Sequence, residues 1–526
     1  MMERELTLTK PYIYLPVCAG KTETKLEIFL EDESAFRKKI YEFKVPVADI
    51  DTDIEQYPLD YYAQIPAEQY LGRQIVICAN APKAFMDCIK NDSKKENSED
   101  KIQSPRPLIH FAAETGWTND PNGMIYADGI YHLYFQYNPL NTSWENMSWG
   151  HAVSTDLLHW KQEDTVLFPD AFGTMFSGCA ISNEHSMLNL PKDALLFFYT
   201  AAGDTNAWSK GLAFTQKIAY SLDGGKTLVK METPCLPTIE KENRDPKVYW
   251  HEETQAYVMA LFLEGNDFAI FRSQDLQQWE QSDRFTLDDA WECPDLLRLT
   301  SDTGETCWFF WSADGFYYQG EFDGFHFKVQ GKQQKAYVND IPYAAQTYFG
   351  VADRTISIPW LRIKNDGRLF TGAYGLPVEL TCRKTENGYI IIQKPVRELM
   401  QQAKQTAYDS ASGGKMLSFG ADKKAVVLKM RAKEGYKGSF TWELGGSVVV
   451  YNSETGAFGV DGVQYQIGCG YREFLFVVDD RILEVFFDGG AQLGTFVLKK
   501  AAVQIKMPDE AAFAENLVYY IEGSNT

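Results

Sequence analysis

The 526-residue sequence lacks the features that mark membrane and nucleic-acid-binding proteins. No run of about 18 apolar residues occurs, which is what a membrane-spanning helix requires. Lys and Arg number 51 against 72 Asp and Glu, so the net charge is −21. Nucleic acids and anionic membranes bind basic surfaces, and this charge balance therefore argues against both as partners.

The cysteines also show no ordered spacing. The nine cysteines form no close pairs, and no Cys-x-x-Cys or Cys/His ligand spacing occurs. We therefore expect reduced thiols, no metal site and no organic cofactor. The first residues lack a basic start followed by an apolar core, so no secretory signal is visible and a cytoplasmic protein is expected. A secreted protein whose signal had been removed would show the same start.

What the sequence contains is a succession of short strand-like segments in distinct regions. Alternating apolar and polar residues predict a small β domain at the N-terminus, and a polar stretch with two prolines predicts a linker after it. Short alternating strands separated by Gly and Asp turns predict a β-sandwich at the C-terminus. The predicted parts are a β domain over 1–90, a linker over 91–107, a repeat region over 108–392, a connecting segment over 393–404 and the sandwich over 405–526.

A turn motif recurs through the repeat region. Ser154-Thr155-Asp156-Leu157 matches Ser273-Gln274-Asp275-Leu276, and related turns carry Asp223 and Asp323. Successive turn aspartates lie 67, 52 and 48 residues apart, each between two strand-like segments. A strand-rich unit with a period near 50 residues is typical of propeller blades, and four units plus a degenerate fifth near 346–390 predict five blades. The alternative is a β-sandwich with similar hairpins. Such a fold does not explain why the turn recurs at the same position in each unit.

Three short motifs place single carboxylates in unusual surroundings: Trp117–Gly123 with Asp120, Arg244-Asp245-Pro246, and Trp291–Asp295 with Glu292. Each acid precedes the turn aspartate of its unit by 30 to 36 residues. All three are therefore expected on the opening strand of a blade, where they would converge at one mouth of the channel. Paired carboxyl groups across a sugar are the machinery of glycoside hydrolysis.

With these motifs the chain resembles glycoside hydrolase family 32, the invertases, levanases and inulinases, over roughly 108–526. The resemblance extends to Tyr134–Pro139, Trp149–Ala152 and Phe176–Gly178. It implies a five-bladed propeller followed by a β-sandwich. It further implies that Asp120 is the nucleophile, Glu292 the general acid/base and Asp245 the transition-state stabiliser of a retaining hydrolase.

The same resemblance implies a set of substrate contacts. Core packing is the competing explanation for both tryptophans among them. Thr118 stands where the family usually has Met, and Val378 stands where it has Arg in the segment Pro377–Leu380. The implied substrate-binding residues are Asn119, Gln136, Trp144, Phe176, Ser177, Arg244 and Trp360.

The substrate is expected to be a fructan or sucrose-type carbohydrate. The segment Asn146–His151 is more similar to the levanase and inulinase branch, which favours exo-acting release of fructose from fructans and also from sucrose. Three alternatives stay open: a sucrose-dedicated invertase, an endo-acting levanase, and a noncatalytic sugar-binding propeller. Related inverting propeller families acting on arabinose or xylose polymers have different motifs. The sequence predicts neither the linkage preference nor the oligomeric state.

Overall fold

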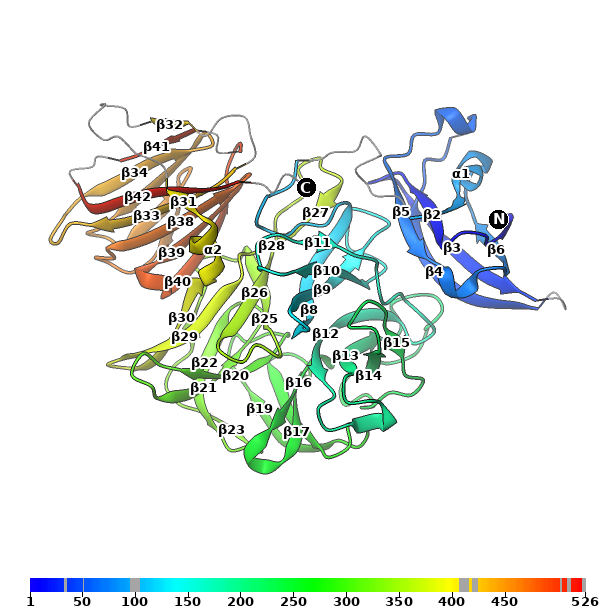
Figure 1. Cartoon of the computed structure of the whole chain (residues 1–526), viewed down its shortest axis with the longest axis horizontal. Coiled ribbons are helices and arrows are strands. Elements are labelled where there is room, and N and C mark those ends of the chain that lie inside the picture. Colours follow the sequence, from blue (N-terminus) through cyan, green and yellow to red (C-terminus); the bar gives the residue numbers. More distant parts are fainter. Residues whose placement is uncertain are drawn as a thin grey trace.

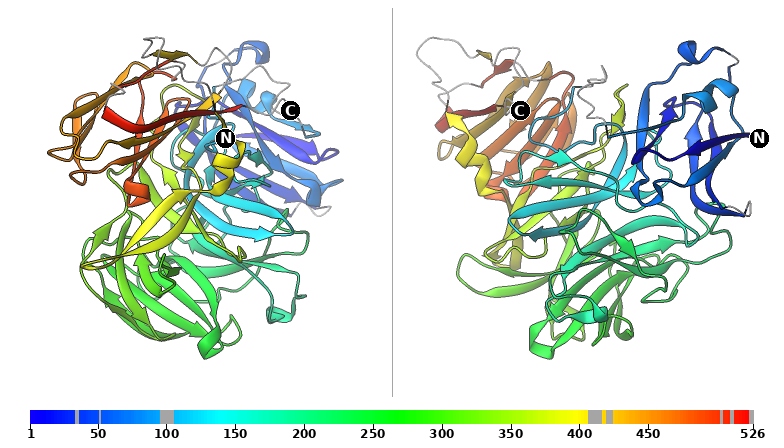
Figure 2. Two further views of the ribbon diagram at one scale, coloured as in Figure 1. Left: turned by 60° about the vertical axis from the view of Figure 1, so that its left-hand side comes forward. Right: turned by 45° about the vertical axis from the view of Figure 1, so that its right-hand side comes forward.

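The chain folds almost entirely into β-strands, as the sequence predicts. The computed structural model describes residues 1–32, 36–50, 52–94, 105–405, 416–418, 424–501, 504–508 and 512–522. Within these ranges the only α-helices are α1 (Lys83–Cys88) and α2 (Arg397–Gln402). Figure 1 shows three groups of sheets side by side, and Figure 2 shows the same groups from two other directions. Neither described α-helix has the length and apolar character needed to cross a bilayer.

The N-terminal residues form two sheets around a core of their own. Buried aliphatic and aromatic side chains of both sheets meet in this core. The first sheet runs β1 (Met2–Thr7), β6 (Gln74–Ala79), β3 (Glu23–Glu31) and β4 (Arg37–Pro46), and the second β5 (Tyr61–Pro66), β2 (Tyr12–Val17) and β7 (Lys90–Asp92). Strand β5 alternates between more and less buried residues, as a half-buried antiparallel strand does, whereas every residue of β2 is buried.

Five antiparallel sheets follow one another between residues 116 and 395. The first contains β8 (Gly116–Ala127), β9 (Ile130–Asn138), β10 (Ser148–Ser154) and β11 (Lys161–Gln162). The second contains β12 (Thr174–Ser182), β13 (Leu195–Ala202), β14 (Thr215–Ser221) and β15 (Val229–Lys230). The third contains β16 (Arg244–His251), β17 (Ala256–Phe262), β18 (Asp267–Ser273) and β19 (Glu280–Thr286).

The fourth sheet contains β20 (Asp295–Thr300), β21 (Thr306–Trp311), β22 (Phe316–Phe322), β23 (Phe327–Val329) and β24 (Gln334–Lys335). The fifth contains β25 (Pro342–Thr347), β26 (Thr355–Leu361), β28 (Ala373–Tyr374), β29 (Val378–Thr385) and β30 (Gly388–Pro395). Strand β27 (Phe370–Thr371) leaves this last sheet and pairs in parallel with β8. The end of the series is thereby joined to its beginning.

The recurring turn of the sequence is a recurring structure. In each of the first four sheets it follows the third strand, and its aspartate accepts backbone N–H groups two to four residues ahead. The residue after the aspartate has positive φ in every case: 65° at Leu157, 72° at Gly224, 64° at Leu276 and 87° at Gly324. An Asp side chain that caps its own turn stabilises this geometry.

The C-terminal residues form two six-stranded sheets packed face to face over an aromatic core. The short C-terminal strands that the sequence predicts are present. The first sheet contains β31 (Lys404–Gln405), β42 (Phe513–Glu522), β33 (Lys424–Ala432), β38 (Glu473–Asp479), β39 (Ile482–Phe487) and β40 (Gln492–Val497). The second contains β32 (Met416–Ser418), β41 (Gln504–Lys506), β34 (Ser439–Leu444), β35 (Ser447–Asn452), β36 (Ala457–Val460) and β37 (Val463–Gln466).

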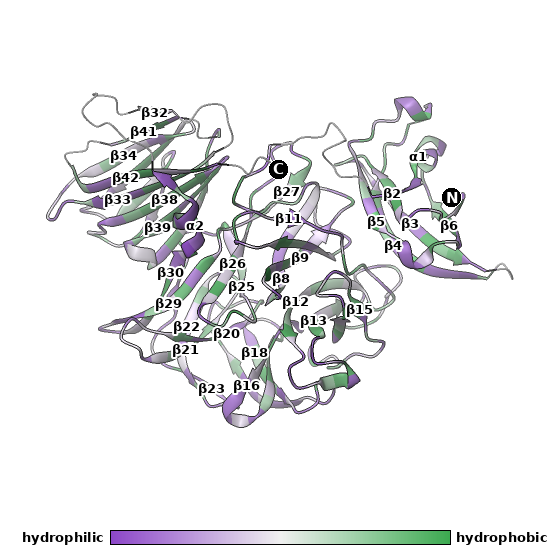
Figure 3. Cartoon of the chain, in the orientation of Figure 1, coloured by the Kyte–Doolittle hydropathy of each residue, from purple (hydrophilic) through white to green (hydrophobic). Residues whose placement is uncertain are grey.

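The core of the middle region continues into the C-terminal sandwich. One hydrophobic cluster joins strands of the first, fourth and fifth sheets to Val427, Val477 and Phe486 of the sandwich. Figure 3 shows that hydrophobic residues concentrate along the strands, whereas many connecting segments are hydrophilic. The sandwich is therefore anchored by apolar burial as well as by polar contacts.

Candidate active site

The structure brings Asp120, Asp245 and Glu292 together around Cys293. The Cys293 thiol donates to Oδ2 of Asp120 at 3.6 Å and to Oδ2 of Asp245 at 3.5 Å, and the Cys293 backbone N–H donates to the same Asp245 oxygen at 3.0 Å. Glu292 is the preceding residue. Asp120 lies on β8, Asp245 lies on β16, and Glu292 lies three residues before β20. The three acidic motifs thus meet, although 172 residues separate Asp120 from Glu292 in the sequence.

Local backbone irregularities aim these side chains into the site. The strand register shifts at Asn119–Asp120 on β8, at Phe176–Ser177 on β12, at Asp245–Pro246 on β16 and at Ala344–Ala345 on β25. A β-bulge redirects a side chain that regular alternation would place on one face. Asp245, Glu292 and Cys293 also have φ values of 65°, 29° and 45°. Such left-handed conformations cost energy in non-glycine residues and cluster at functional sites.

Asp120 has a dedicated hydrogen-bond donor. The Ser177 hydroxyl donates to its Oδ2 at 2.6 Å. Burial, followed by the charge of Glu292, raises the pKa of Asp120 to about 6, whereas the hydrogen bonds from Ser177, Asn119 and Cys293 lower it. An acid with this pKa is still mostly ionised at neutral pH.

Glu292 is held at both carboxylate oxygens. Arg244 donates to its Oε2 from Nε at 3.0 Å and from Nη2 at 2.9 Å, and the Tyr343 hydroxyl donates to its Oε1. The Arg244 guanidinium lies over the rings of Phe262 and Trp291, at 4.5 and 5.7 Å from their centroids. The orientation of Glu292 is therefore fixed before any sugar binds.

Asp245 and Cys293 are both buried beside the other acids. Burial raises the pKa of Asp245 to about 7; Arg244 opposes this shift, while the charges of Glu292 and Asp120 add to it. Burial, followed by the carboxylates of Asp120, Asp245 and Glu292, raises the pKa of the Cys293 thiol well above its usual value. A thiol that stays protonated is a donor and not a nucleophile. Cys293 therefore bridges two acids.

The predicted polar substrate-binding residues differ in the hydrogen bonds that they already make within the protein. Asn119 precedes Asp120, accepts the indole N–H of Trp117 at 3.2 Å, and its carbonyl accepts the Tyr374 hydroxyl. Gln136 is buried and donates to the Met175 carbonyl at 2.8 Å, so its amide nitrogen serves the scaffold. Ser177 and Arg244 contact two of the acids directly.

The predicted aromatic residues pack against other aromatic rings. Trp144 is 48% exposed and meets Phe176 edge to face at 6.3 Å, and Phe176 in turn meets Phe214 at 5.5 Å. Trp360 lies 6.0 Å from Trp117 and 6.1 Å from Tyr343. Within the described ranges the Trp360 indole N–H is buried and has no hydrogen-bond partner. A buried orphan donor beside an acidic site is available to a ligand oxygen.

Two residues have roles that the motifs alone do not reveal. Tyr343 comes from β25, far from every acidic motif, and no recurring pattern marks it. The hydroxyl of the fully buried Thr118 donates to the Thr371 carbonyl at 3.1 Å. Thr118, where the family usually has Met, thus supports the junction of β8 and β27.

Asp295, the last residue of the third acidic motif, belongs to the scaffold. It accepts the Lys247 ammonium at 2.9 Å and the Thr347 backbone N–H at 2.8 Å. These contacts link the third, fourth and fifth sheets beneath the site. No group of three or more His, Cys, Asp or Glu side chains is placed to hold a metal ion in the part of the chain that the structure describes.

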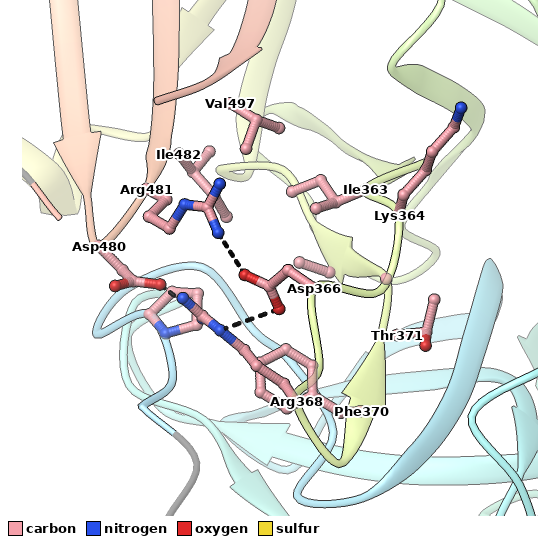
Figure 4. A pocket seen from close by; sticks show the side chains of 13 residues that line it. Ile363, Lys364, Asp366, Arg368, Phe370, Thr371, Asp480, Arg481, Ile482 and Val497 are labelled. Atoms are coloured by element: carbon pink, nitrogen blue, oxygen red, sulfur yellow. Dashed lines mark hydrogen bonds and ion pairs between the residues drawn. The ribbon is translucent and has the colours of Figure 1, made fainter. Parts of the chain in front are cut away.

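A cavity elsewhere in the molecule contains none of the predicted site residues. Figure 4 shows this space of about 60 Å³ between the fifth sheet and the sandwich. Arg368 pairs with Asp480 at 2.6 Å and with Asp366 at 3.3 Å, and Arg481 also pairs with Asp366. These two arginines and two aspartates satisfy one another.

Comparisons with known proteins agree with this geometry. Residues 110–395, more than half of the chain, match the family described as "Glycosyl hydrolases family 32 N-terminal domain". Levanase of Bacillus subtilis (strain 168) is 35% identical over 327 residues, which are 56% of this chain and 47% of that protein. The chain thus spans about half the length of this relative. A β-rich chain with this site is of the glycoside hydrolase class, and it belongs to glycosyl hydrolase family 32.

Solved structures show the same fold. Exo-inulinase from Aspergillus awamori superposes with a TM-score of 0.69 at 24% identity, covering 80% of this chain and 99% of that one. A glycoside hydrolase family 32 protein from Bifidobacterium adolescentis gives a TM-score of 0.66 at 17% identity and covers 99% of this chain and 100% of that one. The second likeness therefore extends over the N-terminal sheets.

Proposed function

We propose that this protein is a retaining β-fructosidase that releases terminal fructosyl units from fructans and from sucrose. The observation that carries the proposal is the convergence of Asp120, Asp245 and Glu292 around Cys293 and Arg244. Levanase, the relative reported above, supports the choice of a fructan. A noncatalytic sugar-binding protein would have no need of three buried or half-buried acids in one pocket, because each raises the cost of holding the others ionised.

The proposed reaction has two displacements. Asp120 attacks C2 of the fructosyl unit while Glu292 gives a proton to the departing oxygen, so that a fructosyl ester forms on Asp120. Water, deprotonated by Glu292, then attacks C2 and releases fructose with retained configuration. The orientation of Glu292 by Arg244 and Tyr343 supports its role as acid and base.

Asp245 is the proposed transition-state stabiliser. Its carboxylate lies between Arg244 and Cys293, where it can accept hydrogen bonds from fructosyl hydroxyls that strengthen as the ring becomes an oxocarbenium ion. Asn119, Gln136, Trp144, Phe176, Ser177, Arg244 and Trp360 are the proposed binding residues. Ser177 and the orphan indole N–H of Trp360 are the best placed of these for polar roles.

The proposed architecture is a five-bladed propeller over 108–392, with each of the five sheets as one blade. An accessory β domain over 1–90 precedes it, with a linker over 91–107. A connecting segment over 393–404 and a β-sandwich over 405–526 follow. The ring of sheets and the β27–β8 pairing support the propeller. The nine unpaired cysteines support a cytoplasmic setting, in which thiols stay reduced.

Product analysis on levan, inulin, short fructo-oligosaccharides and sucrose tests the proposal. Release of fructose alone from the chain ends is expected, whereas oligosaccharide products would indicate endo attack and activity on sucrose only would indicate an invertase. Methanol added as an acceptor distinguishes the stereochemistry, because a retaining enzyme gives the methyl β-fructoside. No release from any of the four substrates would overturn the proposal.

A further inference from the structure

A cleft of about 220 Å³ lies between the N-terminal domain and the middle region. Strands β3 and β4 form one wall, and the segments before β10, before β12 and before β14 form the other. This volume greatly exceeds the share of one water, about 30 Å³. The cleft is therefore large enough for a multi-atom ligand.

The cleft and the acidic site share two chain segments. Thr174 lines it and begins β12, and Phe176 and Ser177 follow on the same strand. Two residues of strand span about 7 Å. Glu145 also lines the cleft and directly follows Trp144, the exposed wall of the site. Two separate segments thus lead from the acids to the cleft.

An aromatic ridge lies along this path. Trp144, Phe176 and Phe214 contact one another in series, with Trp144 about half exposed. Single exposed tryptophans need no explanation. Trp144 packs against Phe176, which packs against Phe214 in turn, and these rings provide a stacking surface for the apolar faces of sugar rings.

The polar groups of the cleft suit an uncharged, hydroxyl-rich ligand. Lys25 and Lys44 carry donors, and Glu23 and Glu145 carry acceptors. These groups also have protein partners: Lys44 pairs with Glu145 at 2.8 Å, Lys25 pairs with Glu27 at 3.0 Å, and Glu23 accepts the Asn141 amide at 2.7 Å. Each ammonium has three donor hydrogens and each carboxylate several acceptor positions, so further hydrogen bonds to a ligand can form. The absence of a basic excess among these lining residues disfavours a phosphate or carboxylate ligand. Sugar hydroxyls donate and accept, and therefore match alternating donors and acceptors.

The two walls of the cleft are held together by specific contacts. The Asn146 side chain accepts the Lys44 backbone N–H at 2.8 Å and donates to the Lys44 carbonyl at 2.8 Å. The buried Glu42 accepts the Trp208 backbone N–H at 3.0 Å. Phe168 packs on Tyr41 at 5.4 Å. The cleft is thus formed before a ligand arrives, which reduces the cost of binding.

We propose that this cleft is a distal sugar-binding site of the enzyme, which receives units of an oligosaccharide beyond the bond that is cleaved. The N-terminal domain thereby contributes to the choice of long substrates over sucrose. This inference rests on the proposed function, because the substrate chain must have its fructosyl end at Asp120.

Filling the cleft tests the proposal. Ala207 lines the cleft and is exposed, so Ala207→Trp places a large ring in it. Ala501→Trp, an exposed alanine of the sandwich, is the matched control. We expect Ala207→Trp to keep kcat/KM for sucrose within twofold of wild type. For chains of four or more units we expect at least a fivefold loss through a higher KM, and no change in the control.

A second variant removes a donor without adding bulk. Lys44→Ala keeps the backbone bonds to Asn146 and should lower kcat/KM at least twofold on long chains alone. Equal losses on sucrose and on long chains, or no loss on long chains in either variant, would overturn the proposal. If the wild type cleaves fructans normally, such results leave the proposed function intact. If the wild type releases no fructose at all, the proposed function itself fails, and this inference fails with it.

Discussion

Arg244 binds Glu292 through two hydrogen bonds to a single carboxylate oxygen, from Nε at 3.0 Å and from Nη2 at 2.9 Å. The second oxygen of Glu292 accepts the Tyr343 hydroxyl. Oδ2 of Asp245 lies 3.9 Å from the same Nε of Arg244. One cation thus orients the proposed acid/base and partly compensates the proposed stabiliser, which explains how three acids occupy one pocket.

Substitution of the proposed nucleophile or acid/base should abolish turnover and preserve the fold. Asp120→Asn and Glu292→Gln retain the size of the side chain and remove its charge, and each should lower kcat by ~10³-fold or more. Fructose release from sucrose and inulin measures the loss, and circular dichroism checks the fold. Glu305→Gln, on the surface of the fourth sheet, is the control. Activity near the wild-type level in either active-site variant would refute the assignment.

The acidic side of the pH profile should report Asp120 and Asp245, which are both proposed to act as carboxylates. Because their pKa values are raised to about 6 and about 7, kcat/KM should fall as the pH drops from about 7 through about 6. The Ser177 hydroxyl donates to Asp120 and lowers the pKa of that acid, so Ser177→Ala should move the falling limb to higher pH.

The control for this pH experiment lies on the same strand. The Ser182 hydroxyl contacts Glu184 at the far end of β12, and Ser182→Ala should leave the limb in place. Initial rates between pH 4 and 8 at low substrate concentration measure both profiles. A Ser177→Ala limb at the wild-type pH would show that another group controls it.

Removal of the Tyr343 hydroxyl should weaken catalysis more than binding. A hydrogen bond to a charged group contributes about 1.5–3 kcal/mol, so Tyr343→Phe should lower kcat about tenfold or more. KM should change little, because the Tyr343 hydroxyl contacts Glu292 and is not expected to contact the sugar. Tyr389→Phe removes a surface hydroxyl bonded to Glu305 and serves as the control. A rise in KM with unchanged kcat would instead make Tyr343 a substrate-binding residue.

Much of this architecture can be predicted from the sequence because it depends on local physics. The Asp turn recurs because an aspartate caps its own backbone, and its spacing predicts four of the five sheets and the phase of the three acids. Tyr343 could not be predicted in the same way, because its role depends on a register shift in a strand with no motif. Gln136 stays a predicted sugar contact, and its amide nitrogen also bonds to the Met175 carbonyl, a scaffold contact that the motif does not reveal. Both the Tyr343 and the Gln136 contacts depend on the tertiary structure.

The buried cluster that joins the sandwich to the middle region also has no signature in the sequence. His110 pairs through Nδ1 with Asp479 at 3.0 Å and through Nε2 with Glu484 at 3.1 Å, and all three side chains are buried. Burial acts to lower the pKa of His110, but the hydrogen bonds and charges of Asp479 and Glu484 outweigh it and raise the pKa to about 9. The histidine is therefore protonated in the folded protein at neutral pH.

This cluster predicts a loss of stability at alkaline pH. A histidine whose pKa is higher in the folded state stabilises fully below its unfolded pKa, about 6.5, and the contribution disappears as the pH rises through about 9. His110→Asn leaves two buried carboxylates without their cation, which should cost about 3–5 kcal/mol at pH 6.5. Urea midpoints measured between pH 6 and 9.5 should decline for the wild type and for the control His185→Asn, whose histidine is exposed. They should decline less for His110→Asn, and equal slopes in all three proteins would contradict the proposed role of the charged histidine.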